Sequence, residues 1–142
     1  MSRSDPLRNF RFRVEIDGLQ AAGFTEVSGL DITTEVIEYR EGTEPSHVRK
    51  LPGLTKYGNV TLKWGITDSM ELHDWHRQIV DGDIQRRSVA IVIQDEQGQD
   101  RARFEVVEAW PCRYQATSLE GKGRQVAIEM IELCNEGIRR VA

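Results

Sequence analysis

The sequence predicts a mainly β protein: a single domain built as a β-sandwich or open barrel that carries one α-helix. Three observations predict this fold class. Short apolar runs bounded by Gly, Pro and Asp recur along the chain and give seven or eight strands. Only one segment, residues 69–81, has the period of a helix. Strands and helices do not alternate, which argues against a doubly wound nucleotide-binding fold.

The length and charge of the chain narrow the classes of function. Its 142 residues fit one domain. The 19 Lys and Arg against 23 Asp and Glu give a net charge of −4, and the two halves of the chain share it evenly. No basic tail or stripe is present, so sequence-specific nucleic-acid binding is not expected.

The chain also lacks the usual membrane and export signals. No apolar run approaches the length of a transmembrane helix, and the first residues, MSRSDP, lack the apolar core of a signal peptide. We therefore expect a protein that is made in the cytoplasm and does not insert into a membrane.

The N-terminal third reads as strands. Residues 10–16 (FRFRVEI) alternate apolar and charged side chains, which is typical of a half-buried strand, and Asp17 with Gly18 supplies a turn. Residues 22–27 can form a short second strand. Residues 32–39 are rich in β-branched side chains, but both faces of that strand are mixed in polarity.

Between residues 40 and 59 the regular pattern stops. Gly and Pro punctuate this segment, while apolar side chains keep it from reading as a polar linker. An irregular connection of about twenty residues is uncommon inside a compact domain. We therefore expect a long loop that packs on something else, either its own sandwich or a partner.

The predicted helix follows a strand at residues 60–66. Asp68 can cap the helix, Glu71 completes a pair resembling a capping box, and Gly82 can end it. The apolar face of the helix consists of Leu72, Trp75, His76 and Ile79, spaced i, i+3, i+4 and i+7.

The C-terminal half reads again as strands. The continuous apolar run at 89–93 predicts a buried strand, and the apolar set of 125–133 shifts phase between Met130 and Ile131. That shift is compatible with three alternatives: a bulge, a strand that is buried on both faces, or a helix. We expect core positions for Trp64, Trp75 and Trp110. The remaining expected pieces are a polar hairpin loop at 95–100, its returning strand at 101–109, an interruption at Pro111, a short strand at 113–116 and a Gly-rich turn at 120–123.

No arrangement of residues predicts catalysis or a cofactor. His73, Asp74 and His76 share the helix, but the other histidine and both cysteines lie far away in sequence, so a metal site is not expected. The Gly-Lys pair at 121–122 lacks the spacing of a phosphate-binding loop, and no nucleophile elbow occurs. We predict that the protein is not an enzyme.

The two cysteines allow one disulfide at most. Cys112 and Cys134 lie in apolar neighbourhoods, which favours small buried thiols. A bridge between them, or a reactive thiol, is the alternative.

Several segments, read in order, resemble the tail-tube (inner tube) family of contractile phage tails and related contractile injection systems. No single piece is specific, but the collinear set covers the chain from about residue 5 to residue 139. The segments are DPLRNFRF (5–12), FTEVSGL (24–30), EYREG (38–42), KLPGLTKYGN (50–59), TLKWGI (61–66), LHDW (72–75), AWPCRY (109–114), VAIEMIEL (126–133) and NEGI (135–138).

This resemblance implies a structural protein. Family members form hexameric rings that stack into a hollow tube inside a contractile sheath, with a baseplate and spike at one end, and the tube conducts DNA or protein cargo. The expected partners are therefore other copies of the chain, sheath protein, baseplate and spike proteins, and a tape-measure protein or cargo. After synthesis the chain would be assembled in a phage tail or an injection particle.

The resemblance also assigns roles to residues. The long loop after the third strand is expected to reach neighbouring subunits, and polar positions on wall strands, with Thr33 and Glu35 as candidates, to face the channel. Two rival functions stay open: a tube-initiating or adaptor paralogue that forms a single ring between spike and main tube, and an unrelated β-rich binding module. The candidate contacts in the loop are Glu41, Glu44, Val48, Arg49, Lys50, Leu51, Pro52, Leu54 and Tyr57.

Overall fold

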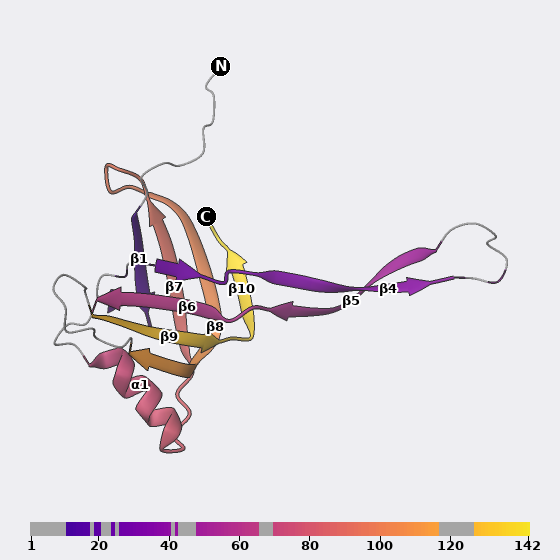
Figure 1. Cartoon of the computed structure of the whole chain (residues 1–142). Coiled ribbons are helices and arrows are strands. Elements are labelled where there is room, and N and C mark those ends of the chain that lie inside the picture. The colour runs from indigo at the N-terminus through magenta and orange to yellow at the C-terminus, as the bar shows by residue number, and fades with distance from the viewer. Residues whose placement is uncertain are drawn as a thin grey trace.

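The computed structural model describes residues 11–17, 19–20, 24, 26–40, 42, 48–65, 70–116 and 127–142. These residues form a β-sandwich with one helix and a long two-stranded arm (Figure 1). The elements are β1 (Arg11–Ile16), β2 (Leu19–Gln20), β3 (Glu26–Ser28), β4 (Ile32–Tyr39), β5 (Arg49–Tyr57), β6 (Val60–Gly65), α1 (Glu71–Val80), β7 (Arg87–Gln94), β8 (Asp100–Ala116), β9 (Ile128–Cys134) and β10 (Gly137–Arg140).

Strand β8 joins the two layers of the sandwich. Its first half pairs with β7 and β10, and its second half pairs with β9, which continues to β6 and β3. The register of β8 with β7 shifts just before β8 passes from one layer to the other, and Glu108 has a positive φ of 52° there. The register of β8 with β9 shifts just after this point. The strand therefore bends from one layer into the other, and β6 and β9 run across β1, β7 and β10 (Figure 1).

The core lies between these layers because each strand sends alternate side chains inward. The burial patterns of β6 and β9 alternate strictly, and β7 is buried on both faces at its centre. The buried apolar cluster is Val14, Ile16, Val60, Leu62, Trp64, Leu72, Trp75, Val89, Ile91, Val106, Ala109, Ile131, Leu133 and Ile138. Trp64 and Trp75 thus occupy the core as predicted, whereas Trp110 is half-buried.

Helix α1 closes one end of the sandwich, below the layers in Figure 1. Leu72 and Trp75 are buried, and the Trp75 indole Nε1 donates to the carbonyl of Gln85 at 2.7 Å. The helix begins later than predicted: Met70 is the N-cap residue and makes no side-chain cap bond, and the predicted cap Asp68 lies outside the described residues. Gly82 follows the helix with a φ of +89°, as predicted for its end.

Two expectations for the C-terminal half are corrected. Pro111 does not interrupt a strand: β8 runs through it, because the register with β9 breaks between Pro111 and Arg113 and a bulge tolerates the missing N–H. The phase shift in β9 is neither a bulge nor a helix. Glu129 takes an inward-facing position beside Ile131 and is itself buried.

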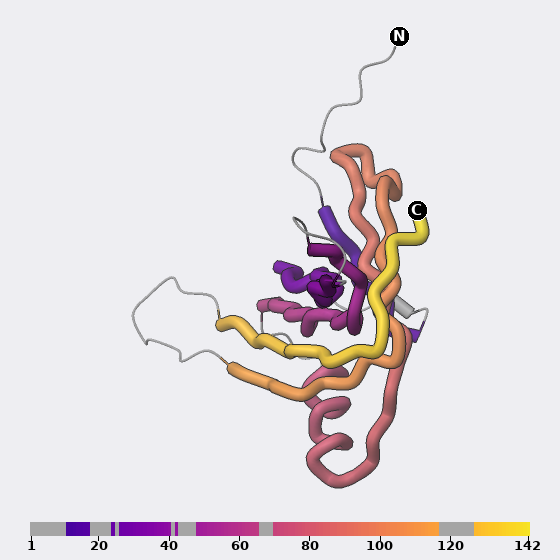
Figure 2. Tube along the Cα trace, turned by 90° about the vertical axis from the view of Figure 1, so that its right-hand side faces the viewer, coloured from indigo at the N-terminus to yellow at the C-terminus, as the bar shows by residue number. Residues whose placement is uncertain are grey.

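The predicted irregular connection is wrong for residues 49–57, which form β5. This strand pairs with β4 in a two-stranded antiparallel arm that projects away from the sandwich (Figure 1). Figure 2 looks along the arm, which is seen end-on in front of the body. The Pro and Gly residues made this segment look like a loop in the sequence. Both strands of a two-stranded arm are edge strands, however, and edge strands tolerate proline. Within the described ranges, no helix is long and apolar enough to cross a bilayer.

Candidate functional site: an exposed β-arm

The arm continues the edge hairpin of the sandwich. Strands β3 and β6 pair inside the body, and β4 and β5 carry the same hairpin outward for eight and nine residues. At about 3.4 Å per residue the arm is roughly 27–30 Å long. Its register shifts once, where Glu35 lies opposite both Gly53 and Leu54.

Apolar side chains lie on both faces of the arm. Facing pairs in the register share a face, so Ile32 with Tyr57 and Val36 with Pro52 lie on one side. Ile37 with Leu51 lies on the other. The bulge places Gly53 on this second side as well, since a Cβ there would lie 3.1 Å from the side chain of Ile37. The arm is thus a single layer of two strands with apolar side chains on both of its faces.

The arm also holds most of the exposed apolar side chains. Of the twelve large hydrophobic residues that are exposed in the described part of the chain, eight lie on β4, β5 or the adjoining Val48. Leu54 is 72% exposed and Val36 59%. Contiguous exposed apolar surface of this kind marks an interaction site or an aggregation hazard in a soluble domain.

The root of the arm is firmly attached to the body. Gly29 has a φ of +90°, and a Cβ at this position would lie 2.1 Å from the carbonyl oxygen of Asn59. The amide of Gly58 donates to the carbonyl of Asp31 at 2.8 Å, and the Asn135 side chain donates to the carbonyl of Gly58 at 2.9 Å. These contacts fix the direction in which the arm leaves the sandwich.

The structure brings together most of the predicted contact residues. Val48, Arg49, Lys50, Leu51, Pro52, Leu54 and Tyr57 all lie on β5 or directly before it, and all are exposed. Glu41 and Glu44 lie outside the described residues, and Thr33 and Glu35 lie on β4, also exposed. Sequence reasoning missed Val36, Ile37 and Tyr39 as contact candidates, although the mixed faces predicted for residues 32–39 were the signal for them.

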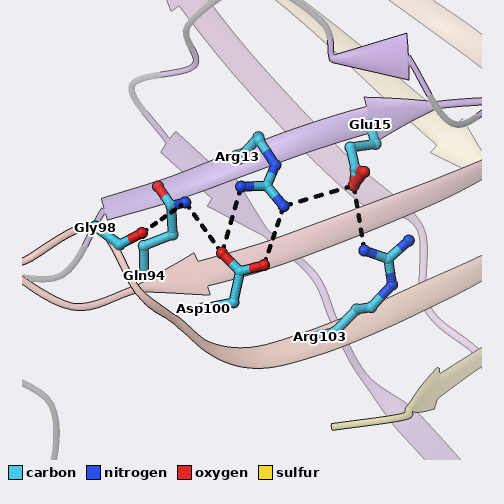
Figure 3. A network of polar contacts seen from close by, with 6 residues as sticks. All are labelled: Arg13, Glu15, Gln94, Gly98, Asp100 and Arg103. Atoms are coloured by element: carbon cyan, nitrogen blue, oxygen red, sulfur yellow. Dashed lines mark hydrogen bonds and ion pairs between the residues drawn. The ribbon is translucent and has the colours of Figure 1, made fainter.

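A contrasting polar surface covers the body on the outer side of β1, β7 and β8 (Figure 3). Arg13 binds Asp100 through two nitrogens at 3.3 and 3.2 Å, and Glu15 contacts Arg13 at 3.7 Å and Arg103 at 3.2 Å. Gln94 also donates to Asp100 at 3.1 Å, and these bonds with the Arg13 charge lower the pKa of Asp100. The side chains of Arg13 and Arg103 flank Val92 on this side of the sheet, and Val92 is fully buried.

A second polar cluster lies under α1. Tyr114 donates to the buried Glu129 carboxylate, and the rings of His73 and His76 pack against Tyr114 with centroids 5.1 and 6.2 Å away. Burial, and then the bond to Glu129, raises the pKa of Tyr114 to about 12. In the part of the chain that the structure describes, no three His, Cys, Asp or Glu side chains are grouped to hold a metal.

A known protein family matches most of the chain. The profile of the family described as "T4-like virus tail tube protein gp19" matches residues 8–139. The chain belongs to this tail tube family. Its role is structural and not enzymatic, which excludes the unrelated binding module as a rival.

Solved structures agree with the family. One similar chain comes from the "Cryo-EM Structure of an Extracellular Contractile Injection System, PVC sheath-tube complex in extended state", at 27% identity and a TM-score of 0.85, covering 96% of this chain and 92% of that one. Another comes from the PVC "sheath/tube terminator in extended state", at 26% identity and a TM-score of 0.88, covering 99% and 100%. Hcp1 from Flavobacterium johnsoniae shares the fold, at 15% identity, a TM-score of 0.64 and coverage of 92% and 94%. No curated protein matches the chain significantly.

Proposed function

We propose that six copies of the chain form a ring, that rings stack into the hollow inner tube of a contractile particle, and that the arm of each copy lies against neighbouring copies. The observation that carries this proposal is the arm itself, which has exposed apolar side chains on both of its faces in the described part of the chain. Family membership supports a tube role, and the arm supplies a surface on which copies can associate.

The physics of the arm favours contact on both faces. A two-stranded hairpin is marginally stable in water by itself, and each strand has one edge of unpaired N–H and C=O groups. Neighbours above and below would remove the side chains of Ile37, Leu51 and Leu54 on one face, and of Val36 and Tyr57 on the other, from water. The edges could then pair with strands of another copy.

Charged residues at the arm suit the rim of such a contact. Glu38 faces Lys50 across the strands, and Thr33 faces Lys56, so charged and polar positions alternate with the apolar ones. Apolar anchors surrounded by polar residues are the usual arrangement at protein interfaces. Thr33 and Glu35 lie on the same face as Ile37 and Leu51. In this arrangement they therefore lie in the contact between copies and not at the channel, through which DNA or protein cargo would pass.

The other partners are proposed from the similar structures. One is described as a sheath–tube complex and another as a baseplate of the anti-feeding prophage. We infer that this chain likewise assembles inside a sheath and meets baseplate or spike proteins at one end. The charged outer surface of Figure 3 is distinct from the arm and remains available for such contacts.

The experiment uses a pair of matched double variants. Leu51→Ser with Leu54→Ser removes apolar surface from the arm, and Val80→Ser with Ile84→Ser removes similarly exposed apolar surface from the body. Both should keep the circular dichroism spectrum of the parent. The arm variant should form no tubes in negative-stain micrographs, whereas the body variant should. Tubes from both variants, or from neither, would contradict a specific role for the arm.

One second candidate is favoured by a specific observation. The chain covers the whole of a structural neighbour described as a sheath/tube terminator, so a protein that forms a single ring at one end of the tube fits as well. Native mass spectrometry gives the number of copies in a ring, and micrographs of concentrated protein separate the two roles. Extended tubes indicate the main tube protein, and isolated rings indicate the terminating or adaptor paralogue.

A further inference from the structure

A small pocket lies in the corner between the root of the arm and the body. Its volume is about 190 Å³, and Tyr57 lines it from the arm. Figure 1 shows β10 at the place where the arm leaves the body. The other lining residues belong to β8, to β10 and to the turn before β10: Val107, Glu136, Gly137, Ile138 and Arg139.

The pocket combines apolar residues with a charged rim. Ile138 is buried and Val107 is half-buried, whereas Glu136 and Arg139 are exposed. The amide of Glu136 donates to the carbonyl of Val107 at 2.9 Å, which holds the turn against β8. An apolar pocket within a polar surround is the kind of site that takes an anchoring side chain from a partner protein.

The arm carries a projecting apolar side chain on the face opposite to this pocket. Tyr57 pairs with Ile32 and Thr55 pairs with Thr34, so these four residues lie on one face of the arm. Leu54 is next to Thr55 in β5 and therefore projects from the other face. At 72% it is the most exposed large apolar side chain in the described part of the chain. Leu54 thus points away from the pocket of its own chain.

We propose that the pocket receives the Leu54 side chain of a second copy of the chain, so that the Leu54 face of one arm lies on the Tyr57 face of the next. This inference rests on the proposed stacking of copies and specifies the contact. Leu54 and Tyr57 are three residues apart, about 10 Å along the strand, which is the displacement that brings Leu54 over a neighbour's pocket. A cavity of about 150 Å³ holds a benzene molecule, so the pocket has room for the four carbons of a leucine side chain.

The charges near Leu54 complement those at the rim of the pocket. Lys56 lies on the same face of the arm as Leu54, and Glu35 lies opposite Leu54 at the bulge. The Leu54 face therefore presents one base and one acid, and the rim presents one acid and one base, Glu136 and Arg139. In the docked pair Lys56 would meet Glu136, and Glu35 would meet Arg139. Opposite charges around an apolar anchor fix the register of the two partners.

The contact has a direct consequence for assembly. Leu54 and the pocket are different surfaces of the chain, so each copy inserts one leucine and receives another. A contact of this heterologous kind continues from copy to copy and ends only where a ring closes. It can therefore extend a stack, which a symmetric contact between two identical surfaces cannot do alone.

Reversing the charges at the rim tests the docked arrangement. Glu136→Lys brings two lysines together at the contact, Lys56→Glu brings two glutamates together, and the double variant restores opposite charges. Assembly of the full-length chain is followed by sedimentation and negative-stain micrographs over a range of concentrations. Each single variant should need about ten times the parent's concentration to assemble, and the double variant should recover most of that loss.

Asp81→Lys is the matched control for the charge reversal. Glu136 lies 3.6 Å from Arg86 and Asp81 lies 3.6 Å from Arg77, so both substitutions remove an exposed ion pair, and neither should change the unfolding temperature much. The control on α1 should assemble like the parent. Single variants that also assemble like the parent, or a double variant no better than the singles, would overturn the docking of Leu54 and leave tube formation intact. A parent that stays monomeric at every concentration would contradict the proposed function and this inference together.

Filling the pocket gives a second test that does not depend on charge. A Cβ at Gly137 would lie 3.6 Å from the Cβ of Val107, which is an ordinary contact. Gly137→Leu should therefore keep the circular dichroism spectrum of the parent, occupy the pocket and prevent assembly at the parent's concentration. Normal tubes from this variant would show that the pocket receives no side chain. If the variant fails to fold, the charge reversal decides the question.

Discussion

The arm and the body use the same kinds of residue in opposite ways. Leu62 in β6 is completely buried, while Leu54 in β5 is 72% exposed, although both lie in strands of one continuous hairpin. In the body, the two layers of strands and the helix bury the apolar side chains. The arm has no second layer, so much of its apolar surface stays exposed unless another molecule covers it. Two regions of one chain thus differ in where their stability comes from.

The largest expected difference comes from truncating these two leucines. Leu62→Ala leaves a cavity in the core and should destabilise the chain by about 2–5 kcal/mol. Leu54→Ala should change the stability of the dispersed chain by no more than about 0.5 kcal/mol, because its side chain is already in water. Urea unfolding followed by circular dichroism measures both, and a large loss for Leu54→Ala would mean that the arm packs on its own body.

The junction between arm and body is the next target. Gly29→Ala places a Cβ against the backbone of Asn59 in a left-handed conformation, and should lower stability by roughly 1–3 kcal/mol. Gly42→Ala is the matched control, since no atom lies within 4 Å of the added Cβ. Thermal unfolding of both variants checks the prediction. If they unfold at the same temperature, the arm root is not held as described.

The polar contact under α1 gives a smaller effect that depends on pH. Tyr114→Phe removes the donor to the buried Glu129 and should cost about 1–2 kcal/mol at pH 7. The pKa of Tyr114 is raised from 10.0 to about 12 on folding, so its contribution is full below pH 10 and is lost as the pH rises through 12. The stability of the parent should therefore fall more steeply over that range than that of the variant. Parallel curves between pH 10 and 12 would refute this reading.

The smallest effect is expected on the exposed charged surface. Asp100→Asn removes a carboxylate whose pKa is lowered from its usual value of 3.8 by bonds from Gln94 and Arg13. Its contribution to stability is present above pH 3.8 and is lost as the pH falls through the lowered pKa. Parent and variant should differ slightly in urea midpoint at pH 7, and this difference should shrink as the pH falls below 3.8. A difference that persists in acid would assign the effect to packing and not to charge.

Local patterns in the sequence predicted much of the body. The alternation of residues 10–16, the apolar run at 89–93 and the polar turn at 95–100 correspond to β1, β7 and the β7–β8 turn, because each reflects burial within the chain. Glu129 broke the pattern of β9, since its polar side chain is satisfied by Tyr114, a partner distant in sequence. Tertiary contacts of this kind leave no local signal.

The arm was harder to predict for a different reason. Periodicity detects a strand by its buried face, and β4 and β5 have no face buried within the chain. Pro52 and Gly53 added the appearance of a loop, although an arm made only of edges accommodates both. The apolar residues of the segment predicted that it packs against another surface. In the structure these side chains remain exposed.

Hydrogen exchange of dispersed and assembled protein tests the central claim most directly. Mass spectrometry compares deuterium uptake by β4 and β5 with uptake by β6 and β9, which are already protected in the core. If copies cover the arm, the amides of β4 and β5 should exchange much more slowly after assembly, while those of β6 and β9 change little. Assembled particles whose arms exchange as fast as those of the dispersed chain would contradict the account.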